Sequence, residues 1–493
     1  MKQTKRRWIA AAAGCTLLFS LVLTGCSGAG DEATETAVPV AETAAASGAY
    51  LTADDITINE TMENSADGEH VITADGEDAS YANIAVNKTG EADGDEADFY
   101  GENAAIFATN GATLTLQEIL VNTNGTHANG VFSYGEGTTV NISDSVIETS
   151  GNCSGGLMTT GGGTMNASNL TIHTTGNSSA AIRSDRGGGT VTVTGGSYTT
   201  DGTGSPVIYS TADVTVSDAA LVSTASQGVV VEGKNSVTLK NVDLTASNTT
   251  KNSDKSDWYQ AVMLYQSMSG DADEGVSAFT MEGGTLTNLN GDIFFVNNTV
   301  AAITLNGASI TNESDGVFLR AAAAGWGSEG SNGGQVTLKA SSQTIDGDML
   351  VDEVSNLNLY LADGNSFTGS INPDGEAGEV YVELTDGAKW TLTADSYISS
   401  LTCDADSIDL NGHTLYVGGT AYTEGTASTG TAIEVTVSEG GHDGMGAPPD
   451  GGMGNLPDGG MGNPPDGGMG NPPGDGQGAP PSGGRGDKPP EKP

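Results

Sequence analysis

Apolar residues recur in a fixed pattern between residues 114 and 345, at relative positions 0, 2 and 7. Two apolar residues separated by one polar residue are typical of a β-strand with one buried face. Most copies begin 23 to 26 residues after the previous one. The copies are Leu114, Leu116, Val121; Val140, Ile142, Ile147; Met165, Ala167, Ile172; Val191, Val193, Tyr198; Val214, Val216, Leu221; Val237, Leu239, Leu244; Phe279, Met281, Leu286; Ile303, Leu305, Ile310; and Val336, Leu338, Ile345, the last stretched by two residues.

A third apolar position follows 17 residues after the first anchor in several copies, as Val131, Leu157, Ile182 and Ile208. Gly, Asn, Asp and Ser separate these strands and favour turns. Equivalent strands that stack at ~4.8 Å pair their backbone groups with the coils above and below. The pattern therefore predicts an all-β fold, a right-handed parallel β-helix with three strands per coil and about 23–26 residues per coil. A β-sandwich, the alternative, would not require apolar columns at a fixed period.

Composition divides the chain into four parts. Residues 1–25 form an apolar leader, and residues 26–47 a polar tether without apolar periodicity. Residues 48–440 hold the repeats, with an irregular first coil around Ile84 and Val86. Residues 441–493 are dominated by Gly and Pro, and an eight-residue unit recurs there. Such a composition buries no core, so we expect the tether and the tail to be disordered.

The leader has the order of a secretory signal. Lys2, Lys5, Arg6 and Arg7 precede an apolar run that is short for a membrane span. The run ends in Leu-Thr-Gly-Cys at residues 23–26, which resembles the lipobox of bacterial lipoproteins. That resemblance implies cleavage before Cys26, a diacylglyceryl group on its sulfur, and a lipid-anchored protein on the extracellular face of the cell membrane. A plain signal peptide is the alternative.

The charge of the chain limits its partners. The formal net charge is −46, and residues 1–25 carry four of the 17 basic residues but none of the 63 acidic ones. So negative a surface repels nucleic acids and anionic lipid head groups, and suits cations and neutral or basic ligands. Beyond Cys26 only Cys153 and Cys403 remain, and we expect them to be isolated thiols.

A later segment resembles known adhesins. A strand led by Trp390 is followed by Asp395-Ser396, a second strand ending at Leu401, and residues 411–416. This order is similar to the last coils of autotransporter adhesin passengers, although no membrane-barrel translocator follows residue 440. More broadly, the repeats resemble parallel β-helix surface proteins of gut-type bacteria. The resemblance implies an adhesin-like or carbohydrate-binding function.

An enzyme of the pectinase-like β-helix class is the main alternative, either a polysaccharide lyase or a glycoside hydrolase. Lyases of this fold need a basic residue for proton abstraction. Residues 48–440 contain only ten Lys and Arg, with Arg183 and Arg186 as the only close arginines. The Arg-x-Pro-x-x-Arg motif of pectate lyases is absent, as are the Asn-Thr-Asp, Gly-His-Gly and Arg-Ile-Lys motifs of polygalacturonases. The sequence therefore predicts no catalytic residue.

Two insertions interrupt the repeats and carry two of the tryptophans. The first includes Trp258 and Tyr259, and the second, residues 321–334, holds Trp326. The segments 268–275 and 321–334 leave equivalent strands two coils apart, so they should project from one edge. Aromatic faces stack on sugar rings, which makes these three residues candidate ligand-binding residues. The alternative is that both Trp side chains pack their own loops onto the scaffold.

Two acidic clusters form a second candidate site. Closely spaced carboxylates can bind Ca²⁺, although neither cluster matches an EF-hand loop. No other cofactor is indicated, and a solvated acidic loop is the alternative. The clusters consist of Asp93, Asp95, Glu96 and Asp98, and of Asp271, Asp273 and Glu274.

Together these features predict a surface-tethered β-helix that presents loops to a glycan or to a host or cell-wall component. A polysaccharide-degrading enzyme and a structural stalk without a ligand stay open as alternatives.

Overall fold

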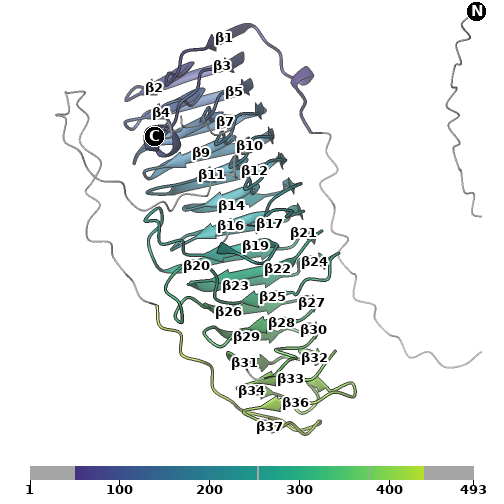
Figure 1. Cartoon of the computed structure of the whole chain (residues 1–493). Coiled ribbons are helices and arrows are strands. Elements are labelled where there is room, and N and C mark those ends of the chain that lie inside the picture. Colours follow the sequence, from purple (N-terminus) through teal and green to yellow (C-terminus); the bar gives the residue numbers. More distant parts are fainter. Residues whose placement is uncertain (1–49, 252–254, 376, 438–493) are drawn as a thin grey trace, which may run out of the picture. The chain divides into compact units, whose positions relative to one another are not determined.

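The computed structural model describes residues 50–437, except 252–254 and 376. The chain divides into two units, Met1–Glu42 and Thr43–Pro493, and the described residues all belong to the second. Cys26, the leader, the tether and the repeats of the tail lie outside them. The described part is a parallel β-helix, as the apolar pattern predicts (Figure 1).

Among the described residues, sheet A contributes two strands to five coils and one strand to each of the others, four of these being 10–12 residues long, and it has 19 strands in all. Its strands are parallel and follow chain order from coil to coil. They are β1 (Glu60–Asn64), β3 (Ala79–Lys88), β5 (Thr113–Thr123), β7 (Thr139–Ser143), β8 (Val146–Thr149), β10 (Gly163–Thr174), β12 (Gly189–Thr200), β14 (Asp213–Ser217), β15 (Ala220–Ser223), β17 (Ser236–Lys240), β18 (Asp243–Ala246), β20 (Val276–Glu282), β21 (Thr285–Asn288), β23 (Thr299–Asn306), β24 (Ser309–Asn312), β26 (Gly334–Ser341), β29 (Asn356–Ala362), β31 (Glu379–Leu384) and β34 (Ser400–Cys403).

Sheet B supplies a further strand to each coil as far as β28 and is also parallel. Its strands are β2 (Ile72–Asp75), β4 (Ile106–Thr109), β6 (Val131–Tyr134), β9 (Leu157–Thr160), β11 (Ile182–Ser184), β13 (Ile208–Ser210), β16 (Val229–Glu232), β19 (Gln260–Tyr265), β22 (Asp292–Asn297), β25 (Leu319–Ala321) and β28 (Met349–Val351). The coil made of β1 and β2 precedes the one that the sequence pattern identifies as the first.

Two small sheets complete the last coils. Sheet C is parallel and sheet D ends in an antiparallel hairpin. The few helical residues form η1 (Ala53–Asp55) and α1 (Asp95–Phe99). Sheet C consists of β27 (Thr344–Asp346), β30 (Ser366–Thr368), β32 (Lys389–Thr391) and β35 (Ile408–Asp409), and sheet D of β33 (Ser396–Ile398), β36 (Leu415–Val417) and β37 (Thr420–Ala421).

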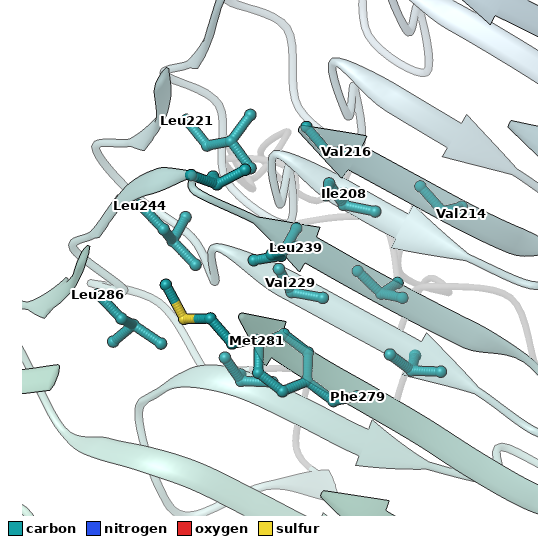
Figure 2. Packing of buried hydrophobic residues seen from close by; sticks show 14 of the residues in the cluster. Ile208, Val214, Val216, Leu221, Val229, Leu239, Leu244, Phe279, Met281 and Leu286 are labelled. Atoms are coloured by element: carbon teal, nitrogen blue, oxygen red, sulfur yellow. The ribbon is translucent and has the colours of Figure 1, made fainter. Parts of the chain in front are cut away.

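The core is a stack of equivalent apolar side chains. Val216 pairs in register with Leu239, which pairs with Met281, and all three are buried. Figure 2 shows these columns, with Leu221, Leu244 and Leu286 forming the next one. Trp390 is also buried, and its ring stacks on Phe367 with centroids 5.4 Å apart. The predicted anchors therefore form one continuous core.

One anchor of the last predicted copy is wrong. Ile303 pairs with Leu338, and Leu305 pairs with Ala340. The copy is therefore Leu338, Ala340 and Ile345, which fits the spacing 0, 2 and 7 without stretching. The error arose because Val336 has the larger apolar side chain, whereas Ala340 is small enough to be missed as a buried position.

Corner residues fix the turns between strands. A column of residues with positive φ bends sheet A in twelve successive coils, and Asn, Asp and Gly dominate because they adopt this backbone region readily. Asn169 donates from Nδ2 to Asp144 Oδ1 at 2.8 Å, which ties neighbouring coils together. The column is Asn83, Glu118, Asp144, Asn169, Gly195, Asp218, Asn241, Gly283, Gly307, Ser342, Asp363 and Asp386.

A second corner is made of stacked glycines that precede sheet B. A Cβ atom on Gly176 would lie 1.8 Å from the carbonyl oxygen of Gly151 in the coil before it. A Cβ on Gly202 would lie equally close to the carbonyl oxygen of Gly176. Every side chain larger than hydrogen is excluded here, so the glycines set the closest approach of successive coils.

Candidate functional site

The outward face of sheet B carries a column of large side chains. Because side chains alternate along a strand, the residues next to the inward anchors point away from the core. Most residues of this column are nevertheless buried, because three long loops cover the face. The column runs Phe107, Phe132, Met158, Arg183, Tyr209, Val230, Met263, Phe295 and Arg320.

The two predicted insertions pack together on this face. The amide of Gly325 donates to the carbonyl oxygen of Lys255 at 2.7 Å, which joins the first loop to the second. The segments after β19 and β25 leave equivalent strand ends two coils apart, as predicted. The loops therefore share one face of the scaffold.

The candidate aromatic residues lie mainly against protein. Trp326 is 6% exposed and meets Tyr265 edge to face, with centroids 5.2 Å apart. Trp258 is half-buried against Phe295, and the guanidinium of Arg320 lies 4.9 Å from its ring centroid. Tyr259 is half-buried, and its carbonyl oxygen accepts a backbone hydrogen bond. Trp326 thus offers little ring surface to a ligand, which matches the packing alternative.

The first acidic cluster binds two arginines, Arg183 on β11 and Arg186 in the turn that follows β11. Asp98 Oδ1 accepts from Arg183 Nη2 at 2.9 Å, and Asp95 Oδ2 accepts from Arg186 Nη1 at 3.0 Å. Both carboxylates lie on α1, which the 89–105 loop carries over sheet B. Asp93 is exposed, and its carboxylate accepts from the amide of Gly94. Arg183 and Arg186 therefore hold this loop in place.

The second acidic cluster is joined to the first through one arginine. Arg186 Nε donates to Asp271 Oδ1 at 2.7 Å, while its Nη1 reaches Asp95. Asp273 is exposed and Glu274 half-buried. In the described part of the chain, no three His, Cys, Asp or Glu side chains are grouped as a metal ion requires. Ca²⁺ binding by these carboxylates stays a prediction. Three of them, Asp95, Asp98 and Asp271, already bind arginine.

A buried ion pair lies beneath Arg186. Asp185 Oδ2 accepts from Arg183 Nη2 at 2.9 Å, and Asp185 Oδ1 accepts from the amide of Arg186 at 3.1 Å. Asp185 is 3% exposed. Burial raises the pKa of Asp185 to about 7, against the opposing effect of the Arg183 charge.

A second buried carboxylate, that of Glu232, lies two coils after Asp185 at the equivalent position. Glu232 accepts from the hydroxyls of Tyr209 at 2.5 Å and Tyr265 at 2.9 Å, and from the amide of Ser267 at 3.3 Å. Burial raises the pKa of Glu232, and these hydrogen bonds oppose the shift. Thr211 stands between Asp185 and Glu232 in the register.

A cleft of about 490 Å³ opens beside this column, where the strands of sheet B end. Tyr100 of the loop that carries α1 and Met268, Gly270 and residues 271–274 of the 267–275 loop contribute to its lining. Its lining includes aromatic, amide and charged side chains: Tyr100, Tyr134, Arg186, Thr211, Asp213, Lys234, Asn235, Gln266, Asp271, Asp273 and Glu274, together with Gly161, Gly187, Gly188, Gly189, Ala212, Met268, Gly270 and Ala272.

Two residues of the cleft hold polar atoms without a hydrogen-bond partner among the described residues. These atoms are Thr211 Oγ1 and Gln266 Oε1. Thr211 is 3% exposed and Gln266 5% exposed. A buried polar atom left unpaired costs about 1–3 kcal/mol, so such atoms point to a missing partner. Ten other buried side-chain atoms of the described residues are also unpaired, so these two atoms support the cleft as the candidate ligand site together with its volume and lining.

Sequence reasoning missed most of this site, although a signal was present. The polar or ionisable residue three positions after each inward anchor of sheet B forms a second outward column. Tyr134 follows Val131 in this way, and Asp185 follows Ile182. The column is Tyr134, Thr160, Asp185, Thr211, Glu232 and Tyr265. Aligning the copies at this position would have grouped these residues.

No helix among the described residues is long and apolar enough to cross a membrane. Both Cys153 and Cys403 are free thiols, as expected from their isolation in the sequence. No family model matches the sequence, and no curated protein matches it either.

Proposed function

We propose that this chain is a lipid-anchored, adhesin-like surface protein whose β-helix binds carbohydrate in the cleft beside sheet B. The observation that carries the proposal is the pair of buried, unpaired oxygens on Thr211 and Gln266. Sugar hydroxyls donate hydrogen bonds and can satisfy both atoms. Thr211 lies in the two-residue turn between β13 and β14, and so short a connection between two strands favours a preformed site.

The walls of the cleft also suit a sugar. Tyr100 and Tyr134 meet edge to face with ring centroids 5.7 Å apart, and both rings are half-buried. Their exposed parts offer apolar surface for the C–H groups of a pyranose ring. Polar groups that fix orientation, next to a small apolar surface, are what binding sites for small ligands provide. The proposed ligand site is therefore the cleft rather than the loops around Trp258 and Trp326.

A glycan screen on the full chain tests the proposal. We expect Thr211→Val to weaken binding about tenfold, because one hydrogen bond from the ligand is lost while side-chain volume is kept. Thr238→Val, on the outer face of sheet A, is the matched control and should leave affinity unchanged. A wild-type chain that binds no glycan, or a Thr211→Val variant that binds as well as wild type, would contradict the proposal.

A second candidate is a glycoside hydrolase. Asp185 and Glu232 lie two coils apart in one column, which places their Cα atoms ~9.6 Å apart at the spacing of paired strands. Glycosidases use two carboxyl groups that flank the scissile bond, and the ~6.5–9.5 Å typical of inverting enzymes is measured between the carboxyl groups rather than between Cα atoms. Three protein groups already donate to Glu232, so the binding function is the better supported. Release of reducing sugar ends that Glu232→Gln abolishes would favour the enzyme.

A further inference from the structure

The charges that line the cleft are unbalanced. Four carboxylates, those of Asp213, Asp271, Asp273 and Glu274, accompany two cations, Arg186 and Lys234. Arg186 is already paired with Asp271 and with Asp95, which lies beside the cleft. The guanidinium carbon of Arg186 also lies 3.5 Å from the ring centroid of Phe99. The cleft therefore presents surplus negative charge to a ligand.

The two unpaired oxygens also indicate which chemical groups the ligand must bring. Gln266 Oε1 is an acceptor only, and Gln266 Nε2 already donates to the carbonyl oxygen of Ala272 at 3.0 Å. A ligand must therefore bring a donor to Gln266. An ammonium group brings three donors and a positive charge, whereas a sugar carboxylate brings only acceptors and a negative charge. The strongly acidic chain would also repel a sugar carboxylate at long range.

We propose that the ligand is a glycan with free amino groups, an oligosaccharide of de-N-acetylated hexosamines. This inference rests on the proposed carbohydrate-binding function and specifies its ligand class. The ammonium group lies among Asp271, Asp273 and Glu274, and neighbouring hydroxyls or the ammonium itself donate to Thr211 and Gln266. The sugar rings lie against Tyr100 and Tyr134.

Isothermal titration of the full chain with three oligosaccharides of equal length tests the inference. The probes are a glucosamine oligomer, its fully N-acetylated counterpart and an oligogalacturonate. We expect the glucosamine oligomer to bind at least tenfold more tightly than the N-acetylated one, and the galacturonate not to bind. Replacing Asp273→Asn and Glu274→Gln together should remove most of this preference. Asp315→Asn, an exposed acid in the turn before β25, is the matched control and should retain it.

The outcomes separate the two proposals. If the N-acetylated oligomer binds as tightly as the amine form, the ligand class is wrong and the carbohydrate-binding function stands. If none of the three oligosaccharides binds, the ligand class is wrong, and the glycan screen decides whether the carbohydrate-binding function stands. If Asp315→Asn lowers affinity as much as the double variant, general charge attraction explains the binding and overturns the assignment. Equal binding of a lysine oligomer of matched charge overturns it in favour of a basic peptide.

Discussion

At the scale of single residues, the buried Asp185 links the site to pH. Its pKa rises from 3.8 to about 7 because burial disfavours the charged carboxylate, while Arg183 opposes the shift. Between these values the folded chain holds a proton that the unfolded chain has released. The contribution of Asp185 to the free energy of unfolding therefore falls as pH rises through this window, by up to ~1.4 kcal/mol per pH unit, and stays constant above it.

Replacing Asp185→Asn should remove this dependence, because the amide keeps the shape of the carboxylate but does not titrate. We expect the stability of the variant relative to wild type to increase between pH 5 and pH 7. Arg183 keeps Asp98 as a partner in the variant. Denaturant unfolding at a series of pH values measures the difference, with Asp315→Asn as the control. A difference that is flat with pH would show that Asp185 stays ionised throughout.

At the scale of elements, the coils could be predicted from the sequence, whereas the cleft could not. The inward anchors repeat at a nearly fixed interval, so the pattern itself reports three strands per coil. Val336 was mistaken for an anchor because alternation alone leaves register open by two residues, and the small Ala340 gave no signal. Register is set by which residues stack, and stacking is a property of neighbouring coils.

The cleft could not be predicted because its walls come from distant parts of the chain. Arg186, which lies on a coil between them, joins the loop before β4 to the loop after β19. Each acidic cluster taken alone resembles a cation site. Only the fold shows that the same arginine contacts both clusters. The prediction that both loops leave equivalent strand ends two coils apart was right, whereas the role assigned to Trp326 depended on burial that sequence does not reveal.

The insertion at 321–334 provides a test at this scale. Trp326→Ala should loosen this loop, because a buried aromatic side chain contributes about 3 kcal/mol to packing. Affinity for the ligand should be unchanged, since Trp326 packs on Tyr265 outside the lining of the cleft. Hydrogen exchange of the loop amides and titration with the bound glycan measure the two effects. Lost affinity without faster exchange would restore Trp326 as a residue that stacks on sugar.

At the scale of the whole molecule, the proposed anchor places this cleft at a cell surface. Cys26 lies outside the described residues, and its lipid rests on the resemblance of residues 23–26 to a lipobox. Two acyl chains are enough for stable membrane attachment. The negative charge of the chain disfavours contact with anionic lipid head groups, which would keep the β-helix off the membrane.

Replacing Cys26→Ala should move the protein from the membrane fraction to the soluble fraction of the producing cells, because no sulfur remains to accept the lipid. Mass spectrometry of the wild-type N-terminal peptide should show the diacylglyceryl group. Cys153→Ala is the matched control and should stay in the membrane fraction. Wild-type protein without an acyl group would contradict the proposed anchor and leave a plain secreted protein.

The stacked glycines have a consequence for how such a chain can change over evolution. Losing or gaining a single residue within a coil would place a side chain where the carbonyl oxygen of the previous coil already lies, as at Gly176 over Gly151. Duplication or loss of a complete coil instead places glycine over glycine and changes the length of the β-helix by ~4.8 Å. Between α1 and β19 even that change would alter the distance between Asp95 and Asp271, which Arg186 bridges. Tolerated variation in length should therefore occur as whole repeats, outside the stretch between α1 and β19.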